Sequence, residues 1–204
     1  IEEKAVFILP YGAHLVLALS SPRRRVLFKQ IGIIDFSIQA ADIAERALAR
    51  ELPPAYALRI AKKKAEKVSK QNENCFVLAA DTVVACGRRI MPKAETEAEA
   101  DRCLNLLSGR RHKVLGAVVI YSPNGTQIYR VVTSVVTFKK LNQEEINFYL
   151  KTREWEGKAG GYAIQGLAAT YIRALNGSYS NVVGLPLYET YQMLRGMGFN
   201  YKVP

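Results

Sequence analysis

The stretch "LVLALSSPRRRVLFKQIG", Leu15 to Gly32, predicts a strand that turns directly into a helix. Its first residues form an apolar run that is typical of a short buried strand. Ser21 is a good N-cap, Pro22 suits the first helical position, and Gly32 stands where glycine closes a helix. The sequence therefore predicts a strand, a serine turn and an arginine-led helix in direct succession.

Arg23, Arg24 and Arg25 occupy the first turn of this predicted helix. The helix dipole is positive at that end, so each cation opposes it by ~0.3–1 kcal/mol unless an anion is bound. Unpaired N–H groups at a helix start bind phosphate, and arginine adds charge-assisted bonds to phosphate oxygens. Two interpretations stay open from these residues alone, a phosphate site and a solvated basic helix face.

The rest of the chain alternates between strand-like and helix-like segments. Apolar or Val/Ile/Thr-rich runs predict strands at 14–19, 36–40, 75–80, 112–121 and 126–141, and the turn "SPNG" between the last two predicts a hairpin. Helical spacing predicts helices at 54–70, 96–109, 142–151 and 186–195, the second and third with capping boxes at Thr96/Glu99 and Asn142/Glu145. No repeat or linker divides the chain. We therefore expect the α/β class, with a mixed sheet flanked by helices in a single domain, 1–204, of two lobes.

Composition limits the classes of protein to which the chain belongs. A chain of 204 residues, 49% of them hydrophobic, can bury one substantial core. Its formal charge of +11 attracts phosphate compounds, nucleic acid or an acidic membrane surface, and charge alone does not choose among them. Three widely spaced cysteines without a CxxC motif argue against disulfides and favour a reducing, cytoplasmic location. No apolar stretch approaches the ~20 residues that span a bilayer, so no membrane partner is expected.

Two acidic residues are candidates for binding metal or activating water. Asp81 and Thr82 follow the apolar run "CFVLAA", and we expect the strand to end there. The carboxyl ends of strands line the ligand crevice of open α/β sheets, where an acid is suited to hold Mg²⁺ or to activate water. Glu45, in "ADIAER", is a second candidate. The alternatives are that Asp81 caps a turn and that Glu45 is a solvated loop acid.

Basic and glycine-rich segments supply the remaining candidates. Lys64 in "AKKKAEK" and Lys93 in "MPKAE" are candidates to face a cleft, although a lysine run on a helix is normally solvated and at most one of its members is expected to do so. In "EGKAGGYAIQG", Lys158 is suited to neutralise phosphate and Gln165 to read a base edge. A tight structural loop is the alternative. With only two histidines and no serine beside an evident base, a serine hydrolase or a zinc site is not expected.

The order of these segments resembles the Maf family of nucleoside triphosphate pyrophosphatases, from Leu15 to about Phe199. "SPRRRVLFKQIG" resembles its opening arginine motif, "ADIAE" its acidic loop, "YALRIAKKKA" its lysine helix and "LAADTVV" its aspartate motif. "LSGRRHKV" resembles its central turn, and "GKAGGYAIQG" with "NGSYSNVVGLPLYET" its C-terminal half. Each motif is weak alone, and their joint order carries the resemblance.

The resemblance implies an elongated two-lobed fold, similar to inosine triphosphatase, with a central cleft. It implies hydrolysis of a nucleoside triphosphate to the monophosphate and pyrophosphate with a divalent metal, Mg²⁺ or Mn²⁺. Asp81 would then be the general base and Glu45 would help it hold the metal. The expected phosphate contacts, besides Ser21 and Lys158, are Arg23, Arg24, Lys64 and Lys93.

Within the family, the residues corresponding to Arg23, Thr82 and Gln165 are associated with pyrimidine substrates such as dTTP and UTP, which favours that branch. The chain departs from the family pattern at three places: at Leu19, where a serine is usual; at "MPKAE", which replaces the usual Lys-Pro order; and at Gly116, where threonine is common.

Two other functions stay open. The charge of +11 and the lysine helix suit a basic nucleic-acid-binding module, although no RNA- or DNA-binding signature appears, so nucleic acid is not the expected partner. Leu19 keeps open a catalytically impaired regulatory homologue. A homodimer is also compatible with the sequence.

Overall fold

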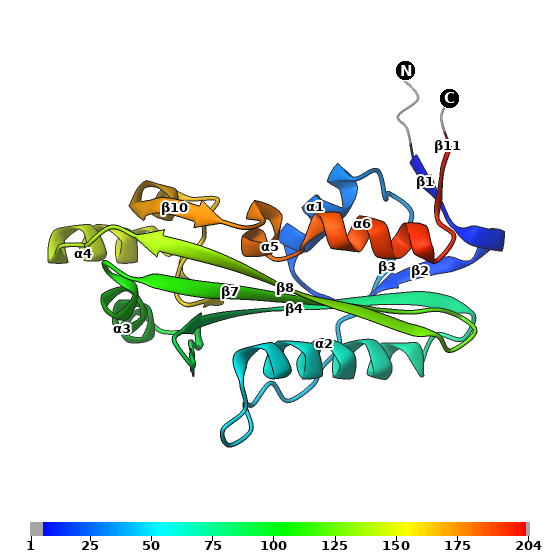
Figure 1. The fold of residues 1–204 in the computed structure, drawn as a ribbon, viewed down its shortest axis with the longest axis horizontal. Coiled ribbons are helices and arrows are strands. Elements are labelled where there is room, and N and C mark those ends of the chain that lie inside the picture. Colours follow the sequence, from blue (N-terminus) through cyan, green and yellow to red (C-terminus); the bar gives the residue numbers. More distant parts are fainter. Residues whose placement is uncertain (1–5, 203–204) are drawn as a thin grey trace.

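The computed structural model describes residues 6–202 as a long mixed sheet with helices on both sides (Figure 1). The strands are β1 Val6–Ile8, β2 His14–Leu17, β3 Ser37–Ile38, β4 Cys75–Cys86, β5 Arg89–Ile90, β6 Lys93–Ala94, β7 Arg111–Tyr121, β8 Gln127–Phe138, β9 Lys158–Ala159, β10 Ile172–Asn176 and β11 Asn200–Lys202. The helices are α1 Pro22–Gln30, α2 Pro53–Ser69, α3 Glu97–Leu107, α4 Gln143–Thr152, α5 Tyr179–Val183 and α6 Leu187–Gly196, with short 3-10 helices η1 Pro10–Gly12 and η2 Leu167–Tyr171.

Three long strands, β4, β7 and β8, form the centre of the main sheet, whose strand order is β10-β8-β7-β4-β2-β3. β2 runs parallel to β3 and β4, and the other pairs along that order are antiparallel. The long strands run along the elongated molecule, with α2 below them and α1, α5 and α6 above (Figure 1). The predicted α/β class, with a mixed sheet flanked by helices, is therefore confirmed.

Short-range sequence signals predicted several element boundaries correctly. α1 follows Ser21, begins with Pro22, and is followed by Gly32 with a φ of 81°. Both predicted capping boxes are formed, at the starts of α3 and α4. β7 and β8 form the predicted hairpin. These predictions succeed because caps and tight turns depend on residues only a few positions apart.

Two hydrophobic cores lie on opposite faces of the sheet. Successive residues of a strand point to opposite faces. In β4, Leu78 and Ala80 belong to the larger core, and Val77 and Ala79 belong to the smaller core between the sheet and α2. Asp81 lies on the same face as Val77 and Ala79 and points toward α2, whereas Thr82 points to the face that carries α1 and α5.

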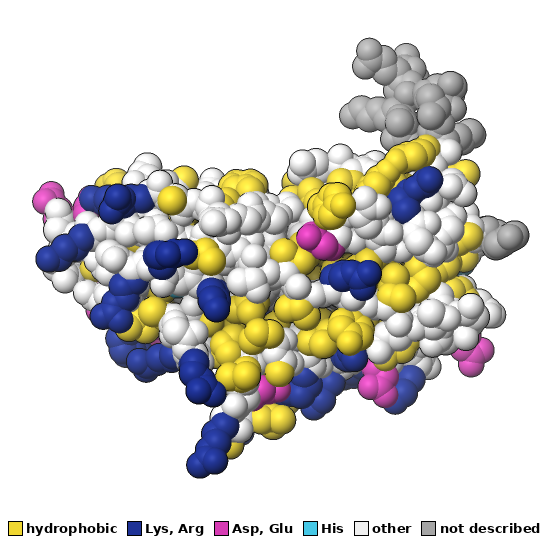
Figure 2. All heavy atoms as spheres, viewed as in Figure 1, with side chains coloured by type: hydrophobic (Ala, Val, Ile, Leu, Met, Phe, Trp, Pro, Cys, Tyr) yellow, Lys and Arg dark blue, Asp and Glu magenta, His cyan; other side chains and the backbone are white. Residues whose placement is uncertain are grey.

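The surface carries the charge expected from the sequence. On the face shown in Figure 2, lysine and arginine side chains outnumber acidic ones, in line with the net charge of +11. The three cysteines are free thiols. Within residues 6–202, no helix has the length and apolar character needed to cross a membrane.

Candidate active site

A pocket opens where β2 stops and β4 continues. β2 pairs with β4 as far as Leu17 opposite Leu78, and β5 pairs with β4 again at Ala85. Between these pairings no strand of the described chain lies along this edge of β4. A cavity of about 550 Å³ lies there and is lined by residues that follow β2 and by residues in the middle of β4. Its volume is typical of a small-molecule site.

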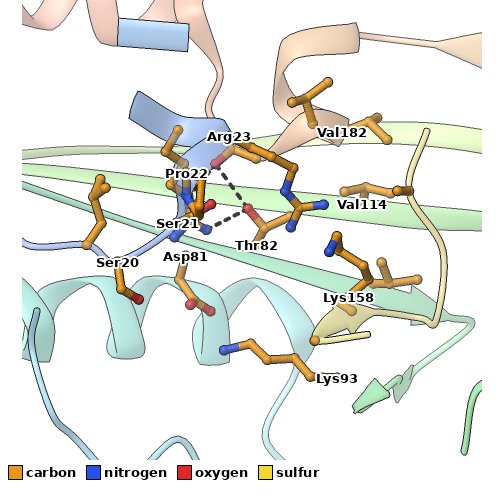
Figure 3. Close-up of a pocket in the computed structure, with 18 of the residues that line it drawn as sticks. Ser20, Ser21, Pro22, Arg23, Asp81, Thr82, Lys93, Val114, Lys158 and Val182 are labelled. Carbon is orange, nitrogen blue, oxygen red and sulfur yellow. Dashed lines mark hydrogen bonds between the residues drawn. The ribbon is translucent and has the colours of Figure 1, made fainter. Parts of the chain in front are cut away.

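The lining of this pocket is strongly charged. In Figure 3, Ser20 and Ser21 lie on one side, Lys158 on the other, and Asp81 and Thr82 between them. Five basic and two acidic residues line it, an excess of three positive charges. A second cavity of about 650 Å³, beside the β7–β8 turn, has no lysine, arginine, aspartate or glutamate among its described lining residues. The charge favours the first pocket as a site for an anionic ligand.

The expectation that the apolar strand ends at Asp81 is wrong. β4 continues to Cys86, and Asp81 lies in its middle, opposite Ala117 of β7. A buried acid is tolerated there because Lys64 Nζ lies 2.8 Å from Asp81 Oδ1 and compensates its charge. The crevice lies instead at the carboxyl end of β2, where the chain leaves the sheet toward α1.

Lys64 connects two carboxylates. Its Nζ lies 2.8 Å from Asp81 Oδ1 and 2.7 Å from Glu45 Oε1, while Lys93 Nζ lies 2.5 Å from Glu45 Oε2. Lys64 belongs to the buried stripe of α2, four residues before Val68, and its neighbours in the lysine run are not buried. The four groups therefore alternate in charge, in the order Lys93, Glu45, Lys64 and Asp81. Lys93 takes part although "MPKAE" departs from the usual order of the family motif.

The carboxylate of Glu45 is held in its ionised form. Burial alone would raise the pKa of Glu45, but hydrogen bonds from Lys64 and Lys93 reverse this and lower the pKa to about 2. Lys64 carries one positive charge and contacts both Glu45 and Asp81, so this charge is shared between the two carboxylates. Asp81 Oδ2 has no hydrogen-bond partner among the described residues, so this oxygen is available to accept a proton or to bind a cation.

These two carboxylates fit a divalent metal that also binds the substrate. No group of three or more His, Cys, Asp or Glu residues that could hold an ion occurs in the part of the chain that the structure describes. Mg²⁺ in phosphate-processing sites is held by one or two carboxylates, and phosphate oxygens and water complete its shell. Asp81 Oδ2 and the Glu45 carboxylate line the same pocket and would provide such a donor set, although both Glu45 oxygens also pair with Lys64 and Lys93.

Arg23 and Lys158 form a cationic wall. Burial and then the nearby charge of Arg24 lower the pKa of Arg23, and burial and then the charge of Arg23 lower the pKa of Lys158. Neither takes part in any of the salt bridges among the described residues; Lys158 Nζ donates to the carbonyl oxygen of Glu156 at 2.9 Å. Two neighbouring cations in the pocket lining, with no carboxylate partner among the described residues, favour a bound anion.

The start of α1 adds donors to this wall. Ser20, Ser21 and Pro22 line the pocket at the helix N-terminus, where backbone N–H groups lack helical partners. The Ser21 hydroxyl, which we expected to cap the helix, makes no capping hydrogen bond. It therefore remains free to bond to a ligand.

Arg24 bonds to the protein as well as lining the pocket. Its Nε donates to the carbonyl oxygen of Gly184 at 2.7 Å, and its Nη2 donates to Thr82 Oγ1 at 3.0 Å. Burial lowers the pKa of Arg24, while Asp81 and Glu45 raise it. These bonds use two of its five N–H groups and tie α1 to β4 and to the end of α5.

Nine of the ten predicted site residues line the pocket, and Gln165 is the exception. Gln165 is exposed, although the preceding Ala163 and Ile164 line the pocket. The Glu154 carboxylate holds the end of this loop, because its Oε2 accepts a hydrogen bond from the N–H of Leu167 at 2.8 Å. Recognition of a base by Gln165 therefore stays a prediction that requires its side chain to turn toward the pocket.

Two departures from the family pattern have a packing explanation. Leu19 is only 3% exposed, belongs to the larger core, and lines the pocket at the same time. At Gly116, a Cβ atom would lie 1.9 Å from Oδ1 of the fully buried Asn181. Gly116 therefore provides the space that Asn181 occupies.

The sequence did not reveal the apolar part of the lining, which consists of residues such as Val84, Val114, Tyr162 and Val182. An apolar residue in a strand looks the same whether it faces a core or a cleft. His112 also belongs near this region, since its Nε2 lies 2.8 Å from the Tyr162 hydroxyl. Burial lowers the pKa of His112 to about 4, so it is a neutral partner of Tyr162.

Comparisons with known proteins add to this geometry. Residues 14–197 match the family model described as Maf-like protein. The chain is 55% identical over 187 residues to a dTTP/UTP pyrophosphatase from Paramagnetospirillum magneticum, covering 92% of this chain and 98% of that protein. It is 52% identical over 188 residues to a dTTP/UTP pyrophosphatase from Caulobacter vibrioides, covering 92% and 97%. A solved structure of a HAM1 protein from Coxiella burnetii matches 90% of this chain and 99% of its own, with a TM-score of 0.49 and 14% identity. Because the family match spans the strand ends, loop and helices that form the pocket, this chain belongs to the Maf family.

Proposed function

We propose that the protein hydrolyses the pyrimidine nucleoside triphosphates dTTP and UTP to the nucleoside monophosphate and pyrophosphate. The observation that carries the proposal is that Asp81, paired with Lys64, lines the same pocket as the two unneutralised cations Arg23 and Lys158. Cleavage of a phosphoanhydride needs a group that accepts a proton from water and cations that stabilise the phosphate oxygens. The relatives named dTTP/UTP pyrophosphatase support the choice of substrate.

Asp81 is the general base in this proposal. Its free Oδ2 accepts a proton from the water that adds to the α phosphorus as the bond to the bridging oxygen breaks. Lys64 holds Asp81 at 2.8 Å, so the carboxylate keeps its orientation. Arg23, Lys158 and the N–H groups at the start of α1 bind the phosphates and stabilise the charge on the leaving pyrophosphate.

Glu45 and Asp81 are the residues that would hold a divalent metal, Mg²⁺ or Mn²⁺. When bound, such an ion offsets charge on the phosphate oxygens. Lys93 keeps Glu45 ionised and directed into the pocket. Arg24 and Thr82 brace the wall between α1 and α5, and Gln165 is the proposed contact to the pyrimidine edge.

The broader setting belongs to the same proposal. Three free thiols support a reducing, cytoplasmic location. A homodimer is compatible with the sequence, and light scattering of the purified protein tests it. We also treat residues 1–204 as a single domain whose two lobes share the pocket, and the single match over residues 14–197 supports this.

A nucleotide panel tests the activity. Pyrophosphate release is measured from dTTP, UTP, CTP, ATP and GTP with Mg²⁺ or Mn²⁺, and release from dTTP and UTP is expected to be fastest. Oligonucleotide binding is measured in parallel at several salt concentrations. If no triphosphate yields pyrophosphate while oligonucleotides bind with a steep salt dependence, the protein is a nucleic-acid-binding module instead.

Asp81→Asn tests the base. The substitution keeps the size of the side chain and removes the proton acceptor, so we expect kcat to fall by at least about 100-fold. Binding of a non-hydrolysable triphosphate is expected to be retained, because the cationic wall is intact. Lys63→Met, at an exposed position of α2, is the control for loss of one charge. Unchanged turnover in Asp81→Asn would refute the assignment.

A further inference from the structure

The loop that carries Glu45 has no regular secondary structure. We call residues 41–52, between β3 and α2, the acidic loop. Most of its residues are exposed, so the loop gains little from burial of apolar surface. Yet Glu45 must lie within hydrogen-bond distance of both Lys64 and Lys93. Some other contact has to fix the position of this segment.

Arg59 of α2 makes that contact. Its Nε and Nη2 donate to the two carboxylate oxygens of Glu51, at 2.6 and 2.7 Å, which is the bidentate geometry of a strong arginine–carboxylate pair. Nη2 also donates to the carbonyl oxygen of Arg46 at 2.8 Å, directly after Glu45 in the chain. Arg59 therefore holds the acidic loop at two residues, Arg46 and Glu51, which flank residues 47–50.

Glu51 extends the same set of bonds into the loop. Its side chain is 8% exposed, and its Oε2 also accepts a hydrogen bond from the N–H of Leu48 at 2.9 Å. Tyr56, one turn before Arg59, donates through its hydroxyl to the carbonyl oxygen of Glu45 at 3.1 Å. The backbone of Glu45 is thus fixed from α2 independently of its carboxylate.

We propose that Arg59 and Glu51 are positioning residues that fix the acidic loop, so that the Glu45 carboxylate stays between Lys64 and Lys93. The inference rests on the proposed pyrophosphatase function, because it concerns the same pocket. Neither residue lines the pocket, so both act through Glu45. Without Arg59 the loop regains conformational freedom, and Glu45 spends less time at the two lysines.

The main alternative is that the Arg59–Glu51 pair only stabilises the surface of α2. The bonding pattern argues against this, since both partners of Arg59 lie in the loop, 8 and 13 positions away in the chain. An ordinary surface pair on α2 looks different. Lys70 and Glu66 are four positions apart at the C-terminal end of α2, with 71% and 51% of their side chains exposed. Lys70→Ala is therefore a matched control for the loss of one ion pair on this helix.

The test is a double-mutant cycle with pyrophosphate release from dTTP as the readout. We expect Arg59→Ala to lower kcat/KM by about tenfold or more, as for the loss of hydrogen bonds to a charged group. Arg59→Lys, which keeps the charge but not the bidentate geometry, is expected to recover part of the loss. In a Glu45→Gln background, Arg59→Ala is expected to cause little further loss, because it acts through Glu45.

Limited trypsin digestion gives a second readout that does not need turnover. Arg46 and Arg50 are cleavage sites within the acidic loop. Cleavage there is expected to be faster in Arg59→Ala and in Glu51→Gln than in the wild type or in Lys70→Ala, with little change in the far-UV circular dichroism. Glu51→Gln leaves α2 untouched and serves if Arg59→Ala folds poorly.

The possible results separate the two hypotheses. Unchanged activity in Arg59→Ala, or a loss that adds in full to that of Glu45→Gln, would overturn the positioning role. Unchanged digestion of the loop would overturn it as well. If the wild-type protein releases no pyrophosphate from any triphosphate, the proposed function fails, whereas the digestion experiment still decides whether Arg59 fixes the loop.

Discussion

Removing the charge of Lys64 tests whether this amine compensates the negative charges of Glu45 and Asp81. Glu45 Oε1 and Asp81 Oδ1 lie 2.7 and 2.8 Å from the same Nζ, so they are at most about 5.5 Å apart. Two negative charges at that separation repel by about 3 kcal/mol at an effective dielectric constant near 20, which corresponds to about 2 pKa units. In Lys64→Met this repulsion is no longer compensated. The pKa of Glu45 is therefore expected to rise by about 2 units or more.

Carbon-13 NMR of the side-chain carboxyl groups measures this directly in the metal-free protein. In the wild type, Glu45 is expected to titrate near its pKa of about 2. In Lys64→Met, burial is left to raise the pKa of Glu45, and Lys93 remains its only amine partner among the described residues. We therefore expect Glu45 in Lys64→Met to titrate much closer to its ordinary range, with loss of turnover as the pH falls through that pKa.

Lys63→Met is the control, because Lys63 is exposed on the same helix and carries the same charge. It is expected to leave the pKa of Glu45 within about 0.5 unit of the wild-type value, as for a distant, screened charge. The reasoning is refuted if Lys64→Met titrates like the wild type. Such a result would mean that solvent, and not Lys64, compensates the charge on Asp81.

Two further substitutions test packing at the edge of the pocket. Leu19→Ser is expected to lower KM for dTTP because it adds a hydroxyl beside the phosphates. It is also expected to lower the free energy of unfolding by about 2–5 kcal/mol, because a buried side chain is lost. An unchanged or higher KM would show that the side chain at position 19 contributes only to packing. In Gly166→Ala, a Cβ atom would lie 2.0 Å from Glu154 Oε2 and displace the carboxylate that holds Leu167, so we expect weaker discrimination of dTTP and UTP from purine nucleotides. Gly196→Ala, whose Cβ would contact nothing within 4 Å, is its control in a thermal unfolding and kinetic comparison.

The sequence predicted those features that depend on neighbouring residues. The serine turn and Pro22 located the start of α1, and two Val/Ile/Thr-rich runs separated by "SPNG" predicted the β7–β8 hairpin. The resemblance of ordered motifs to the Maf family then selected the residues of the pocket. Nine of these ten line one cavity because the fold brings together the start of α1, the interiors of α2 and β4, the acidic loop and the β6–β9 pair.

Features that depend on distant contacts were not predictable in the same way. The acid at position 81 suggested the end of a strand, since an unpaired carboxylate is costly in a sheet. Lys64, 17 positions earlier, removes that cost, and nothing local to Asp81 reveals it. Arg59 and Glu51 were likewise missed, because a charged pair at the start of a helix is indistinguishable in sequence from solvated residues. Gln165 belongs to a recognisable motif, but its side-chain direction depends on a loop.

The continuity of β4, β7 and β8 constrains how the pocket opens and closes. The β4–β7 pairing runs from Val77 to Ala85, past the pocket, and the β7–β8 ladder is continuous over eleven residue pairs. A hinge between the two ends of the molecule would have to bend three hydrogen-bonded strands at once. Access for a nucleotide is therefore expected to depend on the borders of the pocket outside the main sheet, the acidic loop and the segment from Gly157 to Gln165, while the main sheet stays rigid.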